Sequence, residues 1–140
     1  MRQKILKSID SLPPAARNAP KWVLFLPEDE FHEIGLLFAA FIIRESGDKV
    51  VYLGSSVSSD AVIKAFEDIK PQYLLLFLVR YNLIEEVQHY LNELNVGLDH
   101  ERLYVAGNYK LLNQIDYPEK VHWLQDTDAL ENLITNRANV

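Results

Sequence analysis

The sequence has no cysteine, which excludes disulfides, thiolate metal sites and a cysteine nucleophile. It also has no apolar run of the ~18 residues that a membrane-spanning helix needs. Basic residues are few: 14 Lys and Arg stand against 20 Asp and Glu, and the net charge of −6 argues against direct binding to nucleic acid. The first residues lack the apolar core of a secretory signal. We therefore expect a cytoplasmic domain that contacts neither membrane nor nucleic acid.

The length of 140 residues and the apolar share of 49% are typical of a single domain with its own hydrophobic core. Short apolar runs that do not alternate with polar residues predict strands buried on both faces of a parallel sheet. These runs are Lys21–Leu26, Lys49–Leu53, Tyr73–Val79, Arg102–Ala106 and Val121–Leu124.

Helical patterns separate and follow these strands. The spacing of apolar residues predicts helices over Ile34–Glu45, Ser59–Ile69, Leu83–Leu94, Lys110–Ile115 and Asp126–Arg137. Because strand and helix alternate, right-handed crossovers predict an α/β fold: a flavodoxin-like or Rossmann-like, doubly wound, five-stranded parallel sheet in the order 2-1-3-4-5, with three layers. We expect residues 1–20 to form an N-terminal helix and a proline-containing linker, and residues 21–140 to form the α/β domain.

In such sheets ligands bind outside the carboxyl ends of the strands, so the loops there are the candidate site. The loop after the first strand contains His32 among several carboxylates. Glu30 lies two residues before His32, close enough for its carboxylate to accept the imidazole Nδ1–H. That bond would fix the tautomer and leave Nε2 free as a metal ligand or a base. After the third strand, Tyr81 and Asn82 border the same crevice.

The string Glu30-x-His32-x-x-Gly35, which follows a strand and opens a helix, resembles the Asp/Glu-x-His-x-x-Gly signature of cobalamin-binding domains. The segments Leu26–Glu28 and His32–Phe38 most resemble the C-terminal sensor domain of MerR-family transcriptional regulators. The resemblance implies that His32 is the lower axial ligand to cobalt and that Glu30 orients it. Since the corrin ring supplies the equatorial nitrogens, one imidazole completes the lower face, whereas a zinc site needs three or four protein ligands.

Two further groups of residues are candidates for contact with cobalamin. Gly35 would let the start of its helix approach the macrocycle, where a Cβ would collide. Gly54, Ser55 and Ser56 follow the second strand and would line the same crevice with hydroxyl groups. A plain turn and helix cap explains these serines equally well.

Two positions depart from the family pattern. Cobalamin-binding domains carry a Ser or Thr at the end of the third strand and a Gly-Gly pair after the fourth, and these shape the channel for the dimethylbenzimidazole tail. Here Phe77 stands at the first position, and the second keeps only Gly107, after Ala106. The Phe77 side chain makes no conventional hydrogen bond and is much larger than serine, so it either walls a modified tail channel or plugs it.

We therefore expect a non-enzymatic, cobalamin-binding sensor domain of a MerR-type transcriptional regulator. By the resemblance, its partners are the helical bundle and the DNA-binding domain of that regulator, or further copies of itself. Residues 1–20 are too short to supply the bundle. Two alternatives stay open: a small cobalamin-binding subunit of a mutase or corrinoid methyltransferase, and a degenerate domain that has lost the cofactor and serves protein contacts. The nearly uniformly apolar helix Ile34–Glu45 indicates a second covering surface.

Overall fold

The computed structural model describes residues 1–80, 83–99 and 102–138. Within these residues, parallel strands form one 5-stranded sheet in the order β2-β1-β3-β4-β5, which confirms the predicted topology. The strands are β1 (Lys21–Pro27), β2 (Lys49–Val57), β3 (Tyr73–Leu78), β4 (Leu103–Gly107) and β5 (Val121–Trp123). The helices are α1 (Arg2–Asp10), α2 (Ile34–Glu45), α3 (Ser59–Ile69), α4 (Ile84–Gly97), α5 (Tyr109–Leu112) and α6 (Thr127–Ala138).

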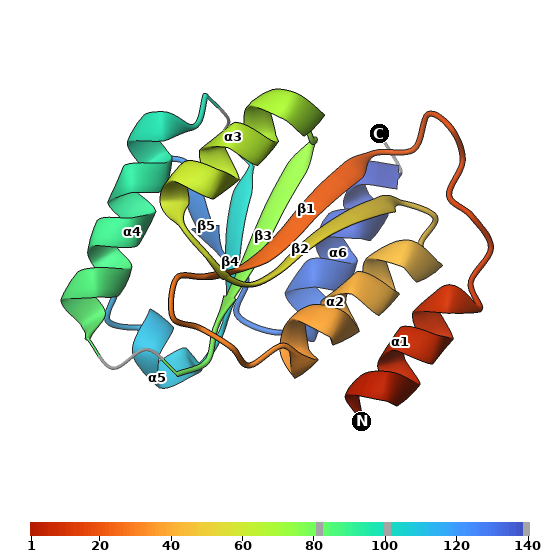
Figure 1. Cartoon of the computed structure of the whole chain (residues 1–140), viewed down its shortest axis with the longest axis horizontal. Helices are drawn as coiled ribbons and strands as arrows, with labels where there is room; N and C mark the ends of the chain where they lie inside the picture. The colour runs from red at the N-terminus through yellow and green to blue at the C-terminus, as the bar shows by residue number, and fades with distance from the viewer. Residues whose placement is uncertain (81–82, 100–101, 139–140) are drawn as a thin grey trace.

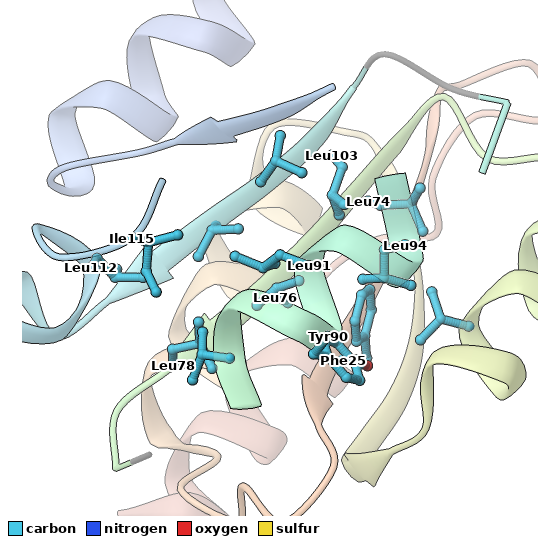
Figure 2. Packing of buried hydrophobic residues seen from close by; sticks show 14 of the residues in the cluster. Phe25, Leu74, Leu76, Leu78, Tyr90, Leu91, Leu94, Leu103, Leu112 and Ile115 are labelled. Carbon is cyan, nitrogen blue, oxygen red and sulfur yellow. The ribbon is translucent and has the colours of Figure 1, made fainter. Parts of the chain in front are cut away.

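Helices cover both faces of the sheet and give the three predicted layers (Figure 1). On one face lie α3, α4 and α5, and on the other lie α2 and α6, with α1 packed outside α2. Each face has its own core because alternate residues of a strand point to opposite faces. Figure 2 shows the core under α4, where Leu91 and Leu94 meet Leu74 and Leu76 of β3.

The opposite core lies between the sheet, α2 and α6. Trp22 of β1 is fully buried there, and its indole ring stacks on Tyr73 with 4.4 Å between ring centroids. Its Nε1–H donates a hydrogen bond of 2.9 Å to Oδ2 of the buried Asp48. Trp22 is therefore a core aromatic residue, and its one polar atom is hydrogen-bonded, as burial requires.

Helix α2 is apolar on nearly all sides. The residues that it contributes to this core are Leu36, Ala39, Ala40 and Ile43. On its outer side Ile34 is 42% exposed and Phe38 is 51% exposed. Helix α1 packs on part of that outer side but has no buried residue of its own. Some of the second covering surface predicted from the sequence is therefore supplied by α1, and Phe38 still presents apolar surface to solvent.

Strand β2 is longer than predicted. The sequence placed its end at Leu53, but it continues to Val57. Its pairing with β1 shifts register at Gly54, whose φ of 92° suits glycine, and the strand then continues along β1. The expectation that Gly54, Ser55 and Ser56 form a loop is therefore wrong: all three lie within β2. Within the described residues, no helix has the length and apolar character needed to cross a bilayer.

Candidate functional site

The loop between β1 and α2 is held by the carboxylate of Glu30, which is 1% exposed. Its Oε1 accepts a hydrogen bond of 2.7 Å from the backbone N–H of Arg80 and another from the backbone N–H of Val79. Burial by itself would raise the pKa of Glu30. The hydrogen bonds from Arg80, Val79, His32 and Phe31 outweigh burial and hold that pKa below its usual value. Glu30 therefore joins this loop, as an anion, to the end of β3.

The other oxygen of Glu30 contacts His32. Oε2 lies 3.3 Å from the imidazole Nδ1, which confirms the predicted contact, and the His32 side chain is 50% exposed. With Nδ1–H donating to the carboxylate, Nε2 carries the lone pair. Among the described residues Nε2 has no hydrogen-bond partner. The arrangement presents one oriented imidazole nitrogen at the carboxyl edge of the sheet, as a metal ligand or base requires.

The backbone of the same loop is fixed by β2. Asp29 has a φ of 68°, and its N–H donates to Oγ of Ser56 over 3.1 Å. The N–H of Ser56 in turn donates to the carbonyl of Glu30 over 3.0 Å. The Ser56 hydroxyl, expected to line a ligand crevice, therefore serves to position the loop that carries His32.

Gly35 lies at the start of α2 and faces the end of β3. A Cβ at this position would lie 2.8 Å from Cε2 of Phe77 and 2.9 Å from its Cδ2. The close approach expected from Gly35 is thus made with the Phe77 ring. The two positions singled out separately in the sequence form one contact, and together they set the distance between α2 and the sheet.

A pocket of about 350 Å³ lies beside Phe77, between α2 and α6. We call it the α2–α6 pocket. Residues from α2, the ends of β3 and β4, and α6 line it, among them Gly35, Ala39, Leu75, Phe77, Ala106 and Leu130. Its volume falls within the range of about 300–1,000 Å³ for small-molecule sites. Met1 and Ile5 of α1 border it as well. Phe77 therefore walls a pocket here and does not fill it.

Gly107, at the end of β4, also lines this pocket. Its φ is 134°, and a Cβ there would lie 2.1 Å from the carbonyl oxygen of Leu78. The next residue, Asn108, donates its backbone N–H to that same oxygen over 2.8 Å. The last residue of β4 must therefore be glycine, because the backbone of β3 leaves no room for a Cβ there.

One polar network at the site was not foreseen from the sequence. The hydroxyl of Tyr52 donates to Oε1 of Glu33 over 3.0 Å, and Nε of Arg2 lies 3.3 Å from Oε2 of the same carboxylate. Burial and the neighbouring Glu33 raise the pKa of Tyr52. These contacts link α1 and β2 to the start of α2. No local sequence pattern predicts them, because Arg2, Glu33 and Tyr52 are far apart in the sequence.

The remaining polar candidates among the described residues add no further group to the site. Tyr81 and Asn82 lie outside the described residues. Within the part of the chain that the structure describes, no group of three or more His, Cys, Asp or Glu side chains is arranged to hold a metal ion. His89 of α4 is a second histidine beside a carboxylate, with Nε2 3.2 Å from Oε1 of Glu93. It lies on the other side of the sheet from α2, apart from the α2–α6 pocket (Figure 1).

No family model matches the chain. The HTH-type transcriptional repressor CarA of Myxococcus xanthus is 29% identical to it over 93 residues, which make up 66% of this chain and 32% of CarA. The chain thus spans about a third of the length of the repressor that it matches.

Solved structures share the fold. A cobalamin-binding protein from Desulfitobacterium hafniense DCB-2 has a TM-score of 0.66 at 19% identity, covering 88% of this chain and 60% of that one. The methanol:cobalamin methyltransferase complex MtaBC from Methanosarcina barkeri also has a TM-score of 0.66, at 20% identity, covering 86% and 47%. The monomethylamine corrinoid protein of the same organism has a TM-score of 0.63 at 15% identity, covering 96% and 62%. The predicted resemblance to cobalamin-binding domains is therefore confirmed for the fold, which this chain shares with them.

Proposed function

We propose that this domain binds cobalamin and serves as the sensor domain of a transcriptional regulator. One observation carries the proposal: an imidazole oriented by Glu30 and an apolar pocket of about 350 Å³ occur together at the carboxyl edge of the same sheet. His32 would supply the lower axial ligand through Nε2. When bound, cobalamin supplies a cobalt ion whose equatorial positions the corrin fills, so a single protein ligand suffices.

The residues present fit the two parts of this cofactor. The carboxylate of Glu30 is anchored by two backbone N–H groups, so it holds the tautomer of His32 without depending on solvent. The α2–α6 pocket, at about 350 Å³, is larger than a cavity of about 150 Å³ that binds benzene. It therefore has room for an aromatic base of two fused rings. The pocket would hold the dimethylbenzimidazole tail.

The apolar surface around the site also suits a large cofactor. Phe31, next to His32, is 63% exposed, and Ile34 and Phe38 border the α2–α6 pocket while remaining partly exposed. Exposed apolar side chains clustered at a pocket mark a binding surface. A macrocycle seated on His32 would cover this edge of the sheet.

Retention of hydroxocobalamin tests the proposal. Purified protein is mixed with hydroxocobalamin and desalted, and corrin absorbance is measured in the protein fraction. We expect stoichiometric absorbance for the wild type and a loss of at least about tenfold in affinity for His32→Ala, as removal of a metal ligand or its partner commonly causes. His89→Ala is the matched control, since it removes a histidine paired with a carboxylate elsewhere. A wild type that retains no corrinoid would refute the proposal and favour a domain that serves only protein contacts.

A corrinoid carrier of a methyltransferase is the second candidate, favoured by the fold shared with MtaBC and the monomethylamine corrinoid protein. The sequence match to a transcriptional repressor favours the sensor. The native reading frame separates them. A sensor requires a DNA-binding domain on the same chain and a ligand-dependent change in operator binding. A carrier instead requires methyl transfer between its bound corrinoid and a partner enzyme.

A further inference from the structure

The inner wall of the α2–α6 pocket is apolar. Leu75 is fully buried there, and Ala39, Leu130 and Leu124 are at most 9% exposed. The polar side chains that border the pocket belong to the run Gln125–Thr127, which is exposed at the start of α6. The buried part of the pocket is therefore suited to a planar group with an apolar edge, and its polar groups stand at the mouth.

Phe77 sets the chemistry of part of the pocket wall. Its ring comes from β3, contacts the start of α2 at Gly35 and borders the pocket. A phenyl ring neither donates nor accepts a conventional hydrogen bond. A polar ligand atom in contact with this wall loses its hydrogen bonds to water and gains none from the protein. Its desolvation therefore lowers the affinity of the ligand.

Natural corrinoids differ in the lower base of their nucleotide tail. In cobalamin the base is dimethylbenzimidazole, whose outer edge carries methyl groups. In adeninylcobamide it is adenine, whose outer edge carries ring nitrogens and an amino group. In cresolylcobamide it is a phenolic ring with no nitrogen at all. In an apolar pocket the three differ in the number of polar atoms left without a partner.

From this wall we infer that Phe77 is a specificity-determining residue, which makes the domain select corrinoids with an apolar lower base and reject those with a purine. The inference rests on the proposed function, since it concerns the same site. It goes further by naming the class of corrinoid and the side chain that selects it.

The expected difference in affinity between corrinoids follows from the number of polar atoms of the base that are buried without a hydrogen-bond partner. We expect adeninylcobamide to bind about tenfold more weakly than cobalamin, which corresponds to about 1.4 kcal/mol. Cresolylcobamide is expected to bind at least as tightly as cobalamin. Cobinamide, which has no lower base, is expected to bind more weakly than either because it leaves the pocket empty.

Equilibrium dialysis of the whole chain against each of the four corrinoids, read by corrin absorbance, measures these affinities. Phe77→Ser and Phe77→Ala form a matched pair, because both remove the ring and only serine adds a hydroxyl. Serine is expected to reduce the preference for cobalamin over adeninylcobamide severalfold relative to alanine. This comparison cancels differences intrinsic to the corrinoids. Thermal melts establish that both variants fold, and the wild-type affinities decide the matter if either does not.

Each outcome bears on a different claim. Equal affinity of the wild type for cobalamin and adeninylcobamide would overturn the selectivity. An equal preference in the wild type and in the serine variant would overturn its assignment to Phe77. Cobinamide binding as tightly as cobalamin would show that the α2–α6 pocket does not receive the base, while leaving corrinoid binding by His32 intact. Binding of none of the four corrinoids would instead refute the proposed function itself.

Discussion

Replacement of Gly35 by alanine probes the closest contact at the site. The added Cβ would lie 2.8 Å and 2.9 Å from two ring carbons of Phe77, well inside the ordinary carbon contact distance of about 3.5–4.0 Å. The ring must therefore move. Phe77 borders a pocket and is only partly buried, so the ring has room to move toward the pocket, which then becomes narrower.

Two opposing effects set the change in stability. Overpacking of a core contact costs about 1–3 kcal/mol, whereas alanine in place of glycine within a helix gains at most about 1 kcal/mol. We expect Gly35→Ala to lower the free energy of unfolding by about 0–3 kcal/mol in the wild type. In a Phe77→Ala background the clash is absent, and the same change is expected to be neutral or stabilising.

Urea unfolding of the wild type, both single variants and the double variant gives a double-mutant cycle for Gly35 and Phe77. The structure predicts a coupling of about 1–3 kcal/mol between the two positions, of favourable sign in the double variant. The m-values should stay constant, since the surface exposed on unfolding hardly changes. Gly35→Ala with the same effect in both backgrounds would refute the reasoning, because it would show that the ring does not occupy the space beside the glycine.

Two further predictions concern the backbone around the site. Gly107→Ala places a Cβ 2.1 Å from the Leu78 carbonyl at a φ of 134°, and is expected to cost at least about 2 kcal/mol in chemical unfolding. A cost of about 0.5 kcal/mol, typical of a surface change, would contradict the packing of β4 on β3. Glu30 has a lowered pKa when folded, so its ionised form stabilises the protein at pH above its ordinary value of about 4.3, and this contribution is lost as pH falls through the folded pKa. Glu30→Gln is expected to lower stability at pH 7 by about 1.5–3 kcal/mol, and the deficit should shrink in acid; an equal deficit at pH 7 and in strong acid would contradict the assignment.

The parts of the fold with local signals were predictable. The helices over Ile34–Glu45 and Ser59–Ile69 have the predicted bounds, because apolar spacing marks the first and Ser58 caps the second, its Oγ accepting a hydrogen bond from the backbone N–H of Ala61. The end of β2 was not predictable, since its continuation past Gly54 depends on its pairing with β1, whose register shifts on both sides of Phe25. Pairing between strands is a long-range property that a single strand's sequence does not encode.

The candidate site divides in the same way. The contact of Glu30 with His32 spans two residues and was predicted from spacing. The backbone donors that anchor Glu30 come from Val79, some fifty residues away, and its neighbour. The contact between Gly35 and Phe77 likewise joins α2 to β3. Both residues were candidates from the sequence. Only the packing of α2 on the sheet shows that the Phe77 ring occupies the space that a side chain at position 35 would need.

The role of His32 is tested most directly by electron paramagnetic resonance of the protein loaded with cob(II)alamin. One axial nitrogen of the common isotope splits the cobalt lines into triplets, whereas nitrogen-15 splits them into doublets. Protein labelled with nitrogen-15 in its histidines is combined with unlabelled cobalamin. We predict doublets, and their loss in labelled His32→Ala protein. Triplets in the labelled wild type would show that the dimethylbenzimidazole nitrogen still occupies the axial position, and would contradict the account.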